Sequence, residues 1–128
     1  MRTITLAAVM ALSGAAAMAD PVLGTWRTQP DDAGRFGLVE MAPCGGKVCG
    51  TLAQSFDASG TLVSSPFDGR LIVDGMSPNG GGAYSGGTIY APDRDKTYRS
   101  KMALAGDRLE VSGCVGPFCR SQVWSRAN

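Results

Sequence analysis

Hydrophobic and polar residues alternate with a period of two along much of the second half of the chain. Tyr98, Met102 and Leu104 share one face of an extended segment, while charged or polar side chains occupy the other. Leu109 and Val111 repeat this alternation a few residues later. Such a pattern is typical of strands with one buried face. The segments with this β character, separated by Pro-Asp, Gly-Asp and Gly-Pro turn signals, are residues 86–92, 95–104, 108–114 and 119–126. Together they predict an antiparallel meander.

The first half of the chain shows the same short-strand pattern in a weaker form. Strand candidates are residues 22–28, 36–42, 50–54, 61–63 and 70–73. The run Ser-Pro-Asn-Gly-Gly-Gly at 77–82 predicts a flexible loop. Short antiparallel strands of this number can close on themselves, which removes the exposed edges of an open sheet. We therefore predict an all-β fold, a small up-and-down antiparallel β-barrel of about eight strands, formed by residues 20–128 as a single domain.

Residues 1–19 have the features of a signal peptide. Arg2 supplies a positive charge, residues 4–12 are apolar, and Ala17-Met18-Ala19 is a small-x-small cleavage site before Asp20. The apolar run is shorter than the roughly 20 residues of a membrane-spanning helix. We expect a periplasmic or secreted bacterial protein with a cleaved signal peptide and no membrane span after cleavage. A retained N-terminal helix is the alternative.

Charge and composition limit the possible functions. The chain has no histidine, which excludes Ser-His-Asp and Cys-His catalysis and histidine metal sites. Without Arg2 the 11 acidic residues are matched by equal basic ones, so nothing favours nucleic acid as a partner. Most carboxylates lie beside Gly, Pro or Ser, where turn formation explains them. We predict no enzyme, no catalytic residue, no metal site and no cofactor. A hydrolase or isomerase that uses carboxylates is the alternative. A calcium site with Asp93 and Asp95 as ligands is a further alternative.

All four cysteines lie in the part expected to be exported, in two pairs with the same spacing, Cys44 with Cys49 and Cys114 with Cys119. In an oxidising compartment such an even set is interpreted first as disulfides. If each pair brackets a four-residue hairpin loop, its cysteines face each other about 4.5 to 5.5 Å apart, within disulfide range. Bridges between the two hairpins, a zinc site and a redox-active pair are the alternatives.

Several of these motifs together resemble a known family. They are Gly-Thr-Ile-Tyr at 87–90, Lys-Thr-Tyr at 96–98, Leu-Glu-Val-Ser-Gly-Cys at 109–114, Cys-Arg-Ser-Gln-Val-Trp-Ser-Arg at 119–126 and Pro-Cys-Gly-Gly-Lys-Val-Cys-Gly at 43–50. The spaced pattern resembles the bacterial exported family catalogued as domain of unknown function 2147. The resemblance implies a lipocalin-like (calycin-type) β-barrel and no established activity. Gly24-Thr25-Trp26 also looks like the first strand of lipocalins, and Arg126 like the arginine that packs over that tryptophan.

A barrel of this size has room for its own side chains or for one small ligand. In the first case the partner is a protein, bound through hairpin tips such as Pro117-Phe118. In the second case the ligand is a small apolar or amphipathic molecule, carried or sensed in the barrel. Glu40 is a further polar candidate for its pocket. The ligand-binding residues that we predict are Trp26, Met41, Tyr90, Tyr98, Met102, Leu104, Arg120 and Gln122. For the last two, either face of the final strand could be the inner one.

Overall fold

The computed structural model describes residues 20–127, and the expected signal peptide lies outside this range. Within it the chain forms strands and turns, with no helix and therefore none suited to spanning a membrane. The strands are β1 (Gly24–Arg27), β2 (Phe36–Cys44), β3 (Lys47–Phe56), β4 (Leu62–Val63), β5 (Leu71–Gly80), β6 (Ala83–Ala91), β7 (Lys96–Ala105), β8 (Arg108–Val115) and β9 (Phe118–Arg126).

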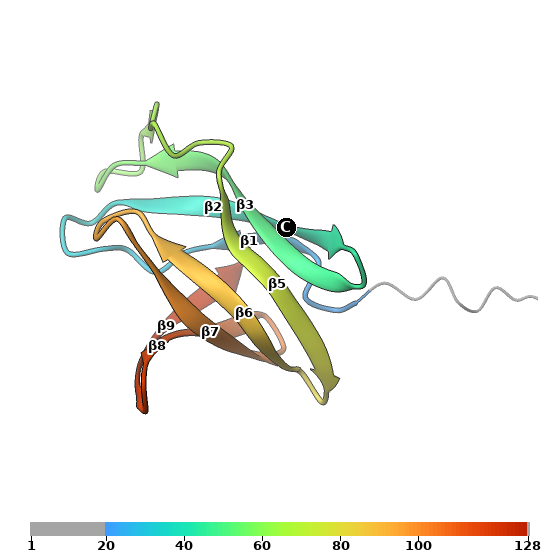
Figure 1. Ribbon diagram of the computed structural model, residues 1–128. Helices are drawn as coiled ribbons and strands as arrows, with labels where there is room; N and C mark the ends of the chain where they lie inside the picture. Colours follow the sequence, from blue (N-terminus) through green and yellow to red (C-terminus); the bar gives the residue numbers. More distant parts are fainter. Residues whose placement is uncertain (1–19, 128) are drawn as a thin grey trace, which may run out of the picture.

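The strands close into an antiparallel barrel (Figure 1). Their order is β2-β1-β9-β8-β7-β6-β5-β3-β4, and the additional pairing of β2 with β3 joins the two ends of the sheet. The two-residue β4 pairs only with the end of β3 and is not part of the wall. Eight strands therefore form the barrel, as predicted. Neighbouring strands are joined mostly by tight hairpins, whose turns use glycines with positive φ such as Gly45, Gly106 and Gly116.

The prediction of a loop at 77–82 is wrong. Strand β5 continues to Gly80, with Ser77 opposite Ser85 and Pro78 opposite Tyr84 on β6. The turn is confined to Gly81 and Gly82. Local composition favours a loop here, but the pairing with β6 holds the backbone extended and overrides it. A register shift between Pro78 and Gly80 lets the ladder continue past the proline.

Apolar side chains fill the barrel over most of its length. The alternation read from the sequence is confirmed, because Met102 pairs with Val111 and Leu104 with Leu109 on one inner face. The side chains of this core, each at most 7 % exposed, include Trp26, Val39, Met41, Val48, Leu52, Val73, Met76, Tyr84, Met102, Leu109, Val111 and Trp124. Three of them are methionines, whose unbranched chains adapt to irregular spaces.

Residues 20–23 close one end of the barrel as a plug. The indole Nε1 of Trp26 donates a hydrogen bond to the carbonyl of Val22 (2.8 Å). The guanidinium of Arg126 donates to the carbonyls of Leu23 (2.9 Å) and Pro21 (2.8 Å). Its central carbon lies 4.2 Å from the Trp26 ring centroid, which confirms the expected cation–π contact. The last strand thus fixes both the first strand and the segment before it.

Both predicted disulfides are present, Cys44–Cys49 and Cys114–Cys119. Cys114 faces Cys119 directly, as expected. The expected length of four residues for each hairpin loop is wrong, because each turn has only two residues between the paired strand ends. In the first hairpin Cys44 therefore pairs with Lys47, and its bridge to Cys49 crosses the ladder diagonally with a Cα–Cα distance of 5.8 Å.

Candidate functional site

The side chains on the inner face of β9 are buried at one end of the strand and exposed at the other. Its register sets Arg120 opposite Gly113, Gln122 opposite Val111 and Trp124 opposite Leu109. Arg120, Gln122 and Trp124 therefore lie on the inner side of the wall, which answers the question that the sequence left open. Trp124 is buried at 2 %, whereas Arg120 and Gln122 are exposed. An inner wall that carries accessible polar groups is open to solvent at this end.

We call this region the mouth and define it by Ile89, Tyr98, Gly113, Arg120 and Gln122. Ile89 pairs with Tyr98, and both side chains are half-buried. A Cβ at Gly113 would lie 3.4 Å from each of them, so both side chains pack closely against the backbone of Gly113. The mouth thus combines a half-buried apolar and aromatic patch with two polar side chains.

The mouth is also connected to the core by a hydrogen bond. The indole Nε1 of Trp124 donates to Oε1 of Gln122 (3.0 Å), which holds the amide against the buried ring. Trp124 therefore lies directly behind the exposed polar groups. Its fluorescence is suited to reporting what happens there, since the indole donates to a mouth residue.

The structure does not bring the eight predicted ligand-binding residues together. Trp26, Met41 and Met102 are at most 3 % exposed, within the core. Leu104 is half-buried and packs against the same core, close to the turn of β5 and β6. Only Tyr98, Arg120 and Gln122 lie at the mouth, and Tyr90 lies elsewhere.

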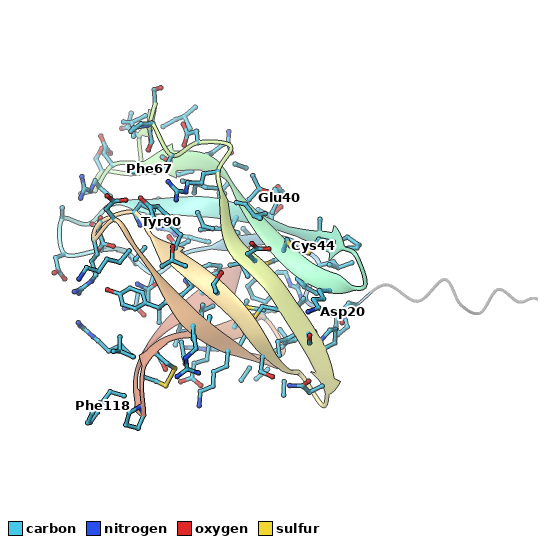
Figure 2. All side chains as sticks on the ribbon, viewed as in Figure 1. Asp20, Glu40, Cys44, Phe67, Tyr90 and Phe118 are labelled. Carbon is cyan, nitrogen blue, oxygen red and sulfur yellow. A yellow bond between two sulfur atoms is a disulfide. The ribbon has the colours of Figure 1, made fainter. Side chains whose placement is uncertain are left out.

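Tyr90 is only 6 % exposed and belongs to a small cluster on the outer side of the barrel wall, where neighbouring side chains cover its ring. It is opposite Thr97 and one residue beyond Ile89, which faces inward. Its ring packs against Phe67, at 5.9 Å between centroids, and beneath the guanidinium of Arg70, at 3.5 Å. Its hydroxyl donates to Asp95 (2.6 Å), and this bond raises the pKa of Tyr90 above its usual range. Figure 2 shows Phe67 and Tyr90 at the same side of the molecule.

Glu40, the other polar candidate, also lies on the outer surface. It is exposed, and its Oε2 accepts a hydrogen bond from the Thr25 hydroxyl (2.7 Å) on the neighbouring strand. In residues 20–127 no three His, Cys, Asp or Glu side chains come together in a way suited to holding a metal ion.

An open groove of about 540 Å³ runs over the outside of the barrel where β1 meets β9. The stacked rings of Phe36 and Phe56, with centroids 5.0 Å apart, form its apolar part, and the guanidinium of Arg27 lies 4.0 Å from the Phe36 centroid. Its lining residues are Arg27, Phe36, Leu38, Phe56, Gly60, Ser125, Arg126 and Ala127. Sequence reasoning missed this groove, because the residues come from four separated segments that only barrel closure brings together.

A second, smaller pocket of about 280 Å³ lies beside the plug. It is lined by Asp20, Leu23, Pro43, Gly46, Lys47, Val48 and Pro78. These side chains come from the plug, the first disulfide hairpin and β5, so this pocket and the mouth are at different ends of the barrel.

An eight-stranded antiparallel barrel with a filled interior, an N-terminal plug and a tryptophan–arginine lock is a lipocalin-like barrel. The chain belongs to the bacterial family described as "Uncharacterized protein conserved in bacteria (DUF2147)", whose model matches residues 24–126. The predicted family is thereby confirmed.

The fold is also similar to a solved structure from Helicobacter pylori, described as "Protein HP1028 from the human pathogen Helicobacter pylori belongs to the lipocalin family". The TM-score is 0.69 at 20% sequence identity, and the match covers 86% of this chain and 85% of the other. At this identity the likeness concerns the fold. None of the curated proteins compared with this chain matches it.

Proposed function

We propose that this is a non-catalytic binding protein that takes a small amphipathic ligand with an anionic head at the mouth of the barrel. The fold of a protein described as a lipocalin supports a binding role. Two disulfides fit an oxidising compartment, in line with a periplasmic or secreted protein released by cleavage before Asp20. Residues 20–128 form the single functional domain in this proposal.

The observation that carries the proposal is the exposure of two polar residues on an inner wall. Arg120 and Gln122 face inward yet are exposed, whereas the inner residues toward the plug are buried. Within residues 20–127 the one ion pair is Arg35–Asp31, so the guanidinium of Arg120 has no carboxylate partner there. A ligand carboxylate at Arg120 would gain a charge-assisted hydrogen bond.

The apolar part of the ligand lies against Tyr98 and Ile89 in this proposal. Deeper entry requires the core to move, because the centre of the barrel is filled. Met41, Met76 and Met102 are the side chains able to repack, since each has several rotatable bonds and no branch. We therefore expect short amphipathic anions to bind at the mouth and longer ones to displace the methionine side chains of the core. In this proposal Met41 and Met102 contact the ligand only after they have moved to admit a long one.

A titration with dodecanoate, followed by tryptophan fluorescence, tests this function. Binding should change the emission of Trp124, which donates a hydrogen bond to Gln122. The variant Arg120→Gln removes the charge and should weaken binding by about tenfold or more, since a hydrogen bond to a charged group contributes about 1.5–3 kcal/mol. Arg108→Gln, an exposed arginine on the outer face of β8, is the matched control and should bind as the parent does.

Two results would contradict the proposal. One is a parent protein whose emission does not respond to dodecanoate at any soluble concentration. The other is an equal loss in both arginine variants, which would indicate a general charge effect. Native mass spectrometry of protein isolated from its own compartment adds an independent measurement, because a carried ligand appears as added mass.

A second candidate function is favoured by the tip of the β8–β9 hairpin. Phe118 is 79% exposed and Val115 66% exposed, on a hairpin that projects from the barrel (Figure 2). A filled barrel with an exposed aromatic tip suits a protein partner, since aromatic anchors dominate many interfaces. If dodecanoate does not bind, this protein-partner function replaces the small-ligand function.

A further inference from the structure

The barrel wall is incomplete between β1 and β9. These strands share only two residue pairs, Trp26 with Arg126 and Arg27 with Ser125. Beyond Arg27 the chain separates from β9 and remains beside β2, where the N–H of Thr28 donates to the carbonyl of Gly37 (3.0 Å). The first part of β9, residues 118–122, is therefore paired with β8 on one side and with no strand of residues 20–127 on the other.

Hydrogen-bond directions identify the backbone groups on this free edge. The N–H of Arg126 points to β8 and donates to Asp107, whereas the N–H of Ala127 points to β1 and donates to Thr25. Directions alternate along a strand, so the odd-numbered residues of β9 direct their N–H and C=O groups toward β1. Cys119 and Ser121 lie beyond the end of β1, and both are exposed. Their backbone groups form an open edge of the sheet.

The next residue in this series shows what the edge accepts. The N–H of Val123 donates to Oε1 of Gln29 (2.9 Å), a side chain from the segment after β1. Gln29 thus supplies the acceptor that a neighbouring strand would supply. The edge of β9 can therefore pair with one more strand, and the Gln29 side chain occupies one of the hydrogen-bonding positions of that strand.

The groove at the β1–β9 junction adds side-chain recognition to this edge. Ser125 lines the groove, and Val123, which is 40% exposed, is the next residue on the same outer face. The groove lining includes Arg27 and Arg126 and no carboxylate. Arg126 already binds the plug carbonyls, so Arg27 is the charge that is available to a partner.

We propose that the open edge of β9 and this groove form a docking site for an extended segment of another protein that carries a carboxylate beside an apolar side chain. The segment adds a strand along residues 119–123, in the place that β1 leaves when it turns away. Its apolar side chain covers Leu38 and Phe36, and its carboxylate pairs with Arg27. The site is on the outer surface, so it does not depend on ligand binding at the mouth.

The segment is antiparallel to β9, as β1 is, because it continues the line of β1. The charge of the groove selects the occupant: a second copy of this chain would present its own β9, whose charged residues Arg120 and Arg126 are both cationic. Like charges at the junction disfavour that arrangement. An acidic partner strand meets Arg27 with opposite charge.

The probe is the acetylated, amidated peptide Thr-Glu-Val-Thr-Phe-Thr, with a second peptide in which lysine replaces glutamate. Backbone amide shifts in two-dimensional NMR spectra report the position of binding. We expect shifts at Cys119, Ser121 and Val123, the last because the peptide displaces Gln29. The lysine peptide should bind about fivefold or more weakly, since it places a cation at Arg27.

Two variants at one residue separate backbone pairing from side-chain loss. Ser121→Pro removes the N–H that faces the open edge but leaves the bonds to β8, and proline is tolerated on edge strands in this orientation. It should weaken the glutamate peptide about tenfold. Ser121→Ala retains the N–H and loses only the hydroxyl contact to Ser112, so it should bind as the parent does. If Ser121→Pro does not fold, Arg27→Glu replaces it and should reverse the preference between the two peptides.

Four outcomes would overturn the proposal. Shifts confined to Tyr98 and Gln122 would assign binding to the mouth, and an absence of shifts at millimolar peptide would exclude the docking site. Equal affinity for the two peptides would exclude the carboxylate. Sedimentation of the peptide-free protein is the remaining check: a dimer that Ser121→Pro abolishes would make a second copy the occupant.

Discussion

At the scale of single residues, Gly87 shows how closely the barrel strands approach each other. A Cβ at this position would lie 2.4 Å from the backbone oxygen of Asp74 on the adjacent strand. The neighbouring Gly86 has a φ of 81° and lies where the register between β6 and β7 shifts. The Gly-Gly pair therefore makes a β-bulge that only glycine accommodates.

We expect Gly87→Ala to destabilise the protein by about 1–3 kcal/mol, because the backbone of β5 must move to admit the methyl group. Gly113→Ala is the matched control. Its Cβ would meet neighbours no closer than 3.4 Å, an ordinary contact, so stability should change by less than about 1 kcal/mol. Urea unfolding of both variants measures the difference. Similar losses for the two would show that β5 does not restrict Gly87.

At the scale of elements, the two disulfides act on hairpins rather than on the barrel as a whole. Each joins cysteines separated by 5 positions in sequence, across a two-residue turn. The first lies beside the plug, and the second lies at the base of the projecting β8–β9 tip. Since the strands of each hairpin are already paired, the bridges limit fraying at the two hairpin ends.

Replacing both cysteines of one bridge with alanine, as in Cys114→Ala with Cys119→Ala, should lower the free energy of unfolding by about 2 kcal/mol, the entropy of a small loop. The β-sheet circular dichroism spectrum should remain, because the barrel core is untouched. The same double change at Cys44 and Cys49 serves as the comparison. Loss of the sheet spectrum in either variant would mean that a bridge holds the fold and not only the hairpin.

At the scale of the whole molecule, the two ends of the barrel are different. One end is closed by the plug, where Asp20 accepts a hydrogen bond from the Tyr84 hydroxyl, and the other carries the mouth and the projecting hairpin. Figure 2 shows Asp20 and Phe118 far apart in the molecule. The exposed polar groups of the inner wall therefore lie at the end opposite the plug, which is where the proposed ligand would bind.

Because of the plug, the free energy of unfolding should decrease at alkaline pH. Burial, with the hydrogen bond to Asp20, raises the pKa of Tyr84 well above its ordinary value of about 10. In the unfolded chain this tyrosine loses its proton near pH 10, while the folded protein retains it. Stability from this group is complete below pH 10 and falls above it, by up to about 1.4 kcal/mol per pH unit.

Tyr84→Phe should therefore make the decline above pH 10 shallower, although it loses the hydrogen bond at neutral pH. Urea unfolding at intervals from pH 8 to about 11.5 measures the slope. Asp20→Asn removes the carboxylate but keeps the phenol buried, so the folded state should lose its proton at lower pH than the parent does. An unchanged slope in Tyr84→Phe would show that the plug does not control the alkaline limit.

The sequence by itself determined the strands, their approximate number and the two local disulfides, whereas the contact between Trp26 and Arg126 was expected only from the resemblance to lipocalins. The strands and the disulfides depend on alternation, turn residues and short-range spacing, which the chain carries locally. Even so, local composition was misleading at 77–82, where pairing with β6 extends β5 through a proline and two polar residues.

Only the tertiary structure decided which predicted site residues are buried and which are exposed. Whether Tyr90 faces in or out depends on the register after the Gly86–Gly87 bulge, and a shift of one residue reverses the faces. Whether Met41 and Met102 line a cavity or fill it depends on packing from strands distant in sequence. The groove and the open edge of β9 arise because β1 ends at Arg27 and the chain then remains beside β2. Those outcomes are set by closure of the barrel, which no local pattern encodes.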